Sequence, residues 1–466
     1  MNQTRTRELT VGSPMKLILR FMLPLIFGLL FQQFYSMVDT IVVGKFLGVD
    51  ALAGVGSTGS INFLVLGLVN GICAGFAIPV AQKFGQRDFE GLRRFVGNMI
   101  WLGSAVALVV TVATTVLCRQ ILVWMHSPAD IFQYAYDYIF LIFLGIPATM
   151  LYNLLSGILR SLGDSRTPLV FLILSSLLNV VLDVVLIVGF EMGVAGAGWA
   201  TVISQLISGL LCLLYIIWKF PILHLCREDL IPRRSCMQRL MVMGFPMGMQ
   251  YSITAIGSIL LQTAVNGLSV SAVAAMTAGN KVSMLATCPF EAMGTTAATF
   301  AGQYLGAGKP ERVHRGVKDC ALLGIVYSVV ICGALYLFGQ QLAELFLDTT
   351  DATAIDQVLP LSQRFLMANA LFYIPLMFVN LLRFTIQGLG YSNLAVFAGV
   401  FEMVARGVFG LCLVPVFGYD AVCFANPAAW IMADIFLFPA YFSCIRKQRL
   451  RFESKAALEQ SGNGAE

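Results

Sequence analysis

The chain has 466 residues and a net charge of +5, and 58% of its residues are hydrophobic. Only 12% are charged, against about 25% in soluble domains. This composition excludes a soluble protein and indicates a polytopic membrane protein, because a membrane span needs about 20 apolar residues and the chain has room for about a dozen. No ATP-binding, metalloprotease or serine-hydrolase motif is present, so no enzyme is predicted.

The predicted fold is an all-α integral membrane protein with twelve transmembrane helices. Ser13-Pro14 is typical of a helix start, since a capping residue is followed by proline in the first turn. No cleavable signal peptide is expected, because the first apolar run is long and contains Asp39. We place the spans near residues 17–43, 52–80, 95–118, 132–160, 168–190, 194–218, 240–267, 272–301, 317–340, 360–386, 394–417 and 421–445.

Lysine and arginine are concentrated in alternate loops, with Arg383 counted among the loop residues. The opposite loops carry mostly acids. The positive-inside rule then predicts that both termini are cytoplasmic and that the number of spans is even. The eleven cysteines have no C-x-x-C spacing and lie mostly in apolar runs, so they are interpreted as small hydrophobic residues rather than disulfides or metal ligands.

The chain contains an internal repeat. Residues 82–96 (QKFGQRDFEGLRRFV) resemble residues 303–317 (QYLGAGKPERVHRGV) at an offset of 221, and Pro24 and Pro246 are separated by 222. Chance similarity of apolar sequence is the alternative, but several matches at nearly one offset favour duplication. The repeat predicts two six-helix lobes of the same orientation. Their bounds are a tail at 1–16, lobes at 17–218 and 240–445, a basic linker at 219–239 and a second tail at 446–466.

Polar residues inside the apolar spans of the first lobe are the candidates for an ion site. Asn179 and Asp183 are four residues apart and share one face of the fifth span. A carboxylate at that depth is expensive, by about 2.5 to 3.5 kcal/mol, and marks an ion or proton path. Asn153 should lie at a similar depth in the fourth span, although a helix-to-helix hydrogen bond would explain it equally well. One face of the first span carries Gln32, Ser36, Asp39 and Thr40; the alternative for Asp39 is that it only marks the helix end.

The second lobe does not repeat this chemistry. Glu402 and Arg406 are four residues apart, and a structural ion pair is the expectation for them. Glu291 follows Pro289, and a carboxylate beside a proline-loosened helix is a plausible lining of a substrate cavity. A helix-stabilising contact is the alternative for Glu291.

Three motifs carry a resemblance to a known family: F-x-x-P-L-I-x-G-x-L-x-Q-x-x-Y-x-x-V-D-T at 21–40, L-R-S-L-G-D-S-R-T-P at 159–168 and A-G-Q-Y-L-G-A-G-K-P-E-R at 301–312. With the two homologous halves, they resemble the multidrug and toxic compound extrusion (MATE) family, in its DinF-type bacterial and archaeal branch. The resemblance extends over nearly the whole chain.

The resemblance implies two lobes around a V-shaped central cavity, and secondary active efflux of organic, often cationic, compounds in exchange for H⁺ or Na⁺. It also implies a cation site made by Asp39, Asn179 and Asp183, with Asn153 in the fourth helix and a looser match at Thr201 in the sixth. One departure is that residues 240–267 contain no acid and offer only Gln250 and Gln262. A cation site in the seventh helix, found in other branches, is therefore not expected.

The expected protein is thus a multidrug antiporter working by alternating access. It would act as a monomer in the cytoplasmic (inner) membrane of a prokaryote, with small-molecule drugs and membrane lipid as partners, no nucleic acid, and no cofactor besides the coupling ion. A flippase for a lipid-linked precursor is the alternative of the same superfamily, but it should need several basic residues in its cavity. A channel is the other alternative, and no filter-like repeat supports it.

Overall fold

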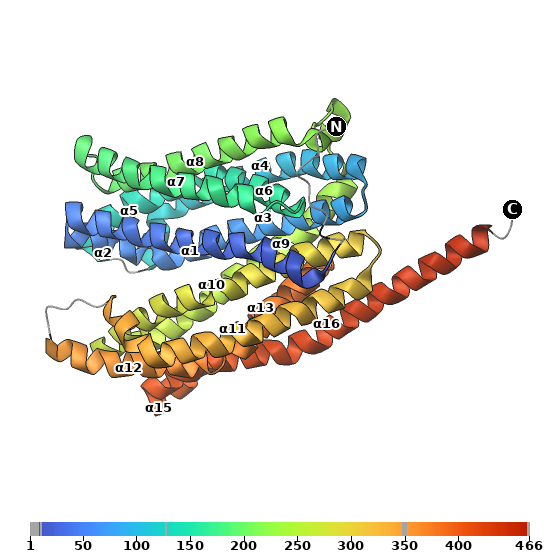
Figure 1. Cartoon of the computed structure of the whole chain (residues 1–466). Coiled ribbons are helices and arrows are strands. Elements are labelled where there is room, and N and C mark those ends of the chain that lie inside the picture. Colours follow the sequence, from blue (N-terminus) through green and yellow to red (C-terminus); the bar gives the residue numbers. More distant parts are fainter. Residues whose placement is uncertain (1–8, 10–11, 126–127, 347–351, 464–466) are drawn as a thin grey trace. The chain divides into compact units, whose positions relative to one another are not determined.

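The computed structural model describes residues 9, 12–125, 128–346 and 352–463 and contains only helices over these ranges (Figure 1). The all-α prediction is confirmed. The helices are α1 (Pro14–Leu47), α2 (Val49–Ser57), α3 (Gly59–Gly85), α4 (Phe89–Trp124), α5 (Ala129–Leu144), α6 (Ile146–Ser161), α7 (Arg166–Val184), α8 (Val194–Lys219), α9 (Arg234–Asn266), α10 (Val270–Gly306), α11 (Pro310–Glu344), α12 (Ala352–Ala370), α13 (Tyr373–Gly388), α14 (Ser392–Val408), α15 (Val414–Phe417) and α16 (Tyr419–Asn463).

The lengths and apolar composition of the helices identify candidate membrane spans. Eight helical stretches in the described residues are long and apolar enough to cross a membrane, and the number rises to ten if two bent pairs each make one span. With α9 and α10, which carry more polar and small residues, these stretches correspond to the twelve predicted spans. The fold is therefore that of a multi-pass membrane protein.

The fourth and tenth predicted spans are broken rather than continuous. α5 and α6 meet at an angle of 46°, and α12 and α13 at 50°. Pro147 follows directly after the first break, and Pro375 lies just beyond the second. Proline lacks the backbone N–H that would continue the hydrogen-bond ladder, and its ring clashes with the preceding turn. Both halves of the chain thus break at corresponding positions.

Two π-helical segments strengthen the internal repeat. Val185–Gly189 (η1) follows α7, and Phe409–Leu413 (η4) follows α14. The turns before α7 and α14 also match, because Gly163 and Gly390 adopt φ angles of 84° and 93° that favour glycine. Segments of π-helix are frequently found at functional sites, and η1 begins two residues after Asp183.

The chain divides into two compact units, which we describe separately. Unit 1 includes residues 21–252, and unit 2 includes residues 9–20 and 253–466. The division falls inside α9 rather than in the predicted linker at 219–239. The first part of α9 belongs to unit 1 because Gly71 and Gly75 of α3 let its backbone approach closely. A Cβ at either glycine would lie 2.6 Å from a carbonyl oxygen of α9, so small residues make this contact possible.

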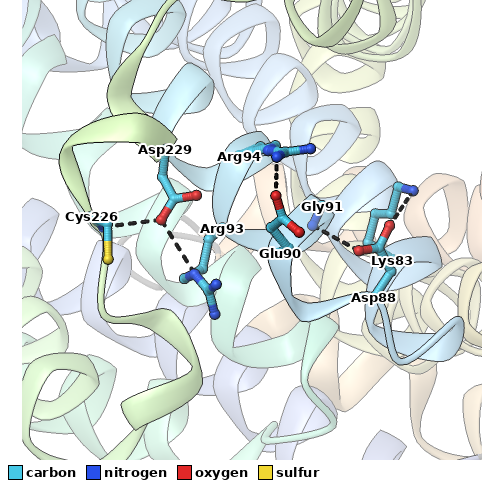
Figure 2. A network of polar contacts seen from close by, with 8 residues as sticks. All are labelled: Lys83, Asp88, Glu90, Gly91, Arg93, Arg94, Cys226 and Asp229. Atoms are coloured by element: carbon cyan, nitrogen blue, oxygen red, sulfur yellow. Dashed lines mark hydrogen bonds and ion pairs between the residues drawn. The ribbon is translucent and has the colours of Figure 1, made fainter.

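Residues 220–233 form part of unit 1. They include two 3₁₀ turns, η2 (Pro221–Leu223) and η3 (Arg227–Leu230), and η3 packs on α4. Figure 2 shows Asp229 between Cys226 and Arg93: its Oδ2 accepts from the Cys226 backbone N–H (3.0 Å) and from Arg93 Nε (3.3 Å). Trp101 Nε1 of α4 donates to the Leu230 carbonyl (2.8 Å). The predicted basic linker is therefore docked on α4 and is not a free connection.

Candidate functional site

The first-half candidates come together in unit 1 at the end of α7. Asp183 lies one residue before the end of α7 and is fully buried, and Asn179 lies one turn earlier with 1% of its surface exposed. Asp39 of α1 is 6% exposed. α7 packs along α8, which carries Thr201, and residues after Asp39 pack with η1 and the start of α8. Asp39, Asn179, Asp183 and Thr201 come from three helices, α1, α7 and α8, and the fold gathers them into one cluster.

The two carboxyls of this cluster face each other. The side chains of Asp39 and Asp183 lie close enough to interact directly. Two carboxyls this close can form a hydrogen bond only when one of them is protonated, because two carboxylates have only acceptors. The arrangement can therefore hold a proton between two acids.

Asn179 ties Asp183 to α8. The orientation of its amide is assigned from the hydrogen bonds it allows. With its nitrogen toward Asp183, it donates to Oδ2 (3.1 Å) and its oxygen accepts from the Thr201 backbone N–H (3.2 Å). In the opposite orientation its nitrogen lies 3.4 Å from the Thr201 hydroxyl. Asn179 thus fixes the position of the Asp183 carboxyl.

Asp39 Oδ1 and Asp183 Oδ1 are buried without a hydrogen-bond partner among the described residues. They are therefore free acceptors for a proton or a cation. No group of three or more His, Cys, Asp or Glu side chains that could hold a metal ion is found over the described ranges. A hard cation would have to use the two carboxylates together with amide and hydroxyl oxygens.

Sequence reasoning missed two tyrosines of the cluster. Tyr35 lies one turn before Asp39 on α1, and its hydroxyl shares a hydrogen bond with the Thr201 side chain. Tyr138 of α5 is 8% exposed and lies within electrostatic range of both acids. The spacing of Tyr35 and Asp39 was available as a signal, whereas Tyr138 comes from a helix that only the fold brings close.

The remaining candidates that lie in unit 1 are Asn153, Gln32, Ser36 and Gln250. Asn153 is half-buried on α6 and donates its Nδ2 to the Thr149 carbonyl one turn earlier (2.9 Å), which uses the amide within its own helix. Gln32 and Ser36 are exposed on α1. Gln250 of α9 is 2% exposed in unit 1.

In unit 2, Glu402 of α14 bridges two arginines. Its Oε1 lies 2.9 Å from Arg383 Nη1 and its Oε2 lies 3.3 Å from Arg406 Nη1. Arg406 Nε also donates to Asn426 Oδ1 (3.0 Å), and Arg383 Nη2 donates to Asn380 Oδ1 (3.4 Å). The expected pair of Glu402 and Arg406 is therefore part of a larger buried network.

Arg383 corrects one assignment. The sequence predicts a loop position for Arg383, but it lies inside α13 with 11% of its side chain exposed. Glu291 of α10 is exposed and lies within electrostatic range of Arg383. Asp434 of α16, which sequence reasoning missed, is 9% exposed and lies within range of Arg383 and Glu402.

These features define a helical membrane protein of two repeated halves, with a buried acid pair in the first and a buried ionic network in the second. A family model described as MatE matches residues 24–185 and 246–411. The chain therefore belongs to the MatE family, whose members are transporters rather than enzymes.

Individual relatives agree with this family. The chain is 28% identical over 353 residues, covering 75% of it and 78% of the relative, to the probable multidrug resistance protein YpnP of Bacillus subtilis (strain 168). It is 24% identical to a protein named FAD transporter from Shewanella oneidensis MR-1, over 73% of this chain and 76% of that protein. A crystal structure of MATE in complex with MaL6 has the same fold, with a TM-score of 0.85, 21% identity, and coverage of 97% and 99% of the two chains.

Proposed function

We propose that this protein is a secondary active multidrug efflux transporter that exports organic, often cationic, compounds in exchange for H⁺ or Na⁺ by alternating access. The observation that carries the proposal is the buried pair of Asp39 and Asp183. Charged groups at membrane depth are costly, so a pair of acids held there suits a role in moving an ion. The name of the relative in Bacillus subtilis supports multidrug export as the transported class.

Of the two coupling ions, the contacts favour H⁺. The Asp39 and Asp183 carboxyls lie close enough to share a proton, and like charges this close disfavour ionisation of both. Deprotonation would leave two adjacent carboxylates, with the Asn179 amide donating to Asp183. The charge of the pair therefore changes by one unit when the proton is lost.

Coupling follows from unequal affinity. An ion can shift an alternating-access equilibrium only if it binds one state more tightly than the other. Protonation from the outside would lower the negative charge of the pair by one unit and favour release of the drug outward. Release of the proton inside would restore the charge and complete the exchange. The energy comes from the ion gradient, since the sequence has no nucleotide-binding motif.

The test is transport in proteoliposomes with the pH gradient and the Na⁺ gradient imposed separately. Ethidium serves as the organic cation and FAD as an anionic cargo, because one relative is named for it. We expect the pH gradient alone to drive ethidium movement. Lack of stimulation by either gradient, with either cargo, would overturn the antiport proposal.

Variants test the site assignment. Asp39→Asn and Asp183→Asn should each abolish gradient-driven transport. The matched control is Asp130→Asn, because Asp130 is an exposed acid in the first turn of α5. If both Asp39→Asn and Asp183→Asn retain transport equal to that of Asp130→Asn, the acid pair is not the coupling site.

A further inference from the structure

The ionic network of unit 2 has an excess of acid. Glu402 of α14 pairs with Arg383 of α13 and Arg406 of α14. Glu291 of α10 and Asp434 of α16 lie within electrostatic range of Arg383. α13, α14 and α16 pack against one another, and α10 packs on α13. With all five groups ionised, the cluster carries one net negative charge. An uncompensated charge inside a membrane protein is unfavourable unless a proton or a cation neutralises it.

The hydrogen bonds identify where that neutralising charge belongs. Both Glu402 oxygens contact arginine nitrogens, and Arg406 contacts Glu402 and Asn426. The unsatisfied atoms of the cluster are Arg383 Nε and Asp434 Oδ1, both buried without a partner over the described ranges. Among the described residues, Asp434 is thus the buried acid of the cluster that has no ion pair with an arginine. A carboxyl that is buried, unpaired and close to another acid is the one that favours its neutral form.

We propose that Asp434 is a proton-binding site of the second half, separate from the Asp39 and Asp183 pair of the first half. Protonation of Asp434 makes the five-residue cluster electrically neutral. Glu402 from α14 and Arg383 from α13 are the charged groups that face it. The other polar pairs along α16 are further away: Asp420 with Arg364 lies about 20 Å earlier along the helix, and Tyr441 with His314 of α11 lies two turns later.

Binding of a cargo at Glu291 could cause release of the Asp434 proton. Glu291 is the exposed member of the cluster, whereas Asp434 is buried. An organic cation bound at Glu291 would neutralise its carboxylate, and Glu291 would then no longer attract Arg383. Arg383, with an unused Nε, would then be available to an ionised Asp434. Binding of the cation would thus release the proton through Arg383.

This inference rests on the proposed function for its meaning in transport, but its test does not use transport. The purified full chain is titrated in detergent, and the infrared absorption of protonated carboxyl groups is followed as the pH is raised. We expect a carboxyl band that disappears on deprotonation in the wild type. Asp434→Asn should remove that component, and Asp434→Glu should shift its frequency. The matched control Asp420→Asn changes a side chain that is 49% exposed and should leave the band unchanged.

The outcomes distinguish failure of the Asp434 proposal from failure of the proposed function. If neither Asp434→Asn nor Asp434→Glu alters the carboxyl bands, Asp434 does not bind the proton and the proposal is wrong. If Asp434→Asn does not yield folded protein, the frequency shift in Asp434→Glu decides the question alone. A positive infrared result with no gradient-driven transport of either ethidium or FAD would reject the proposed function, and the proton site would remain.

The link to Glu291 is tested with tetraphenylphosphonium as the probe. Saturating tetraphenylphosphonium should diminish the Asp434 band in the wild type and should have no such effect in Glu291→Gln. A band that is equally insensitive in both proteins would overturn the displacement step. A band equally diminished in both would place the cation elsewhere and also overturn it.

Discussion

Replacing Asp229 tests whether the segment between the halves is held to α4. The Asp229 side chain is 6% exposed and accepts two hydrogen bonds, from the Cys226 backbone N–H (3.0 Å) and from Arg93 Nε (3.3 Å) (Figure 2). Asp229→Ala removes both and leaves the N–H without its acceptor. A hydrogen bond to a charged group contributes about 1.5 to 3 kcal/mol. The arginine contact adds less than about 1 kcal/mol, because Arg93 is 28% exposed and solvent screens the pair.

We therefore expect Asp229→Ala to destabilise the protein by about 2 to 3 kcal/mol. For a unit of this size, that lowers the thermal midpoint by roughly 5 to 10 °C. The measurement is the fraction of monodisperse protein in detergent after heating, at one fixed heating rate because such unfolding is often irreversible. Glu228→Ala is the matched control, since Glu228 is the exposed neighbouring acid. Equal midpoints for the two variants would refute the docking argument.

Three further predictions follow from the structure. Gly75→Val should reduce the yield of folded protein several-fold in size-exclusion chromatography, because a Cβ there meets the α9 backbone, whereas Gly333→Ala has open space and should behave as wild type; equal yields would contradict the close packing. Glu402→Gln should destabilise the protein by about 3 kcal/mol or more and so lower its thermal midpoint, because two buried arginines lose the acid that they share. An unchanged midpoint would mean that the network does not contribute to stability. Lys83, whose Nζ lies 2.6 Å from Asp88 Oδ2, holds the pKa of Asp88 below its usual value. The stabilisation by Asp88 is then present above its unfolded pKa of about 4 and lost as the pH falls through the lowered folded value. The small stability difference between wild type and Asp88→Asn, under about 1 kcal/mol for this part-exposed pair, should vanish at acid pH and persist at neutral pH.

The sequence alone was enough for those features that depend on neighbours along the chain. The apolar runs predict the helices, because a span must satisfy its own backbone hydrogen bonds. The repeat predicts two like halves. The four-residue spacing places Asn179 and Asp183 on one helix face, and that spacing holds in α7. Each of these depends on local periodicity, which the amino-acid order contains directly.

Only the tertiary structure decided which polar groups meet. Asn153 has the right depth, yet its amide bonds within its own helix. The sequence alone predicts that Arg383 is a loop cation. In the structure, α13 and α14 pack together and bring it to Glu402, nineteen residues away. Asp434 becomes notable only because its neighbours leave its Oδ1 without a partner. Such contacts depend on helix packing and on the competition for a few hydrogen-bond donors. Neither can be predicted from the spacing of residues along one helix.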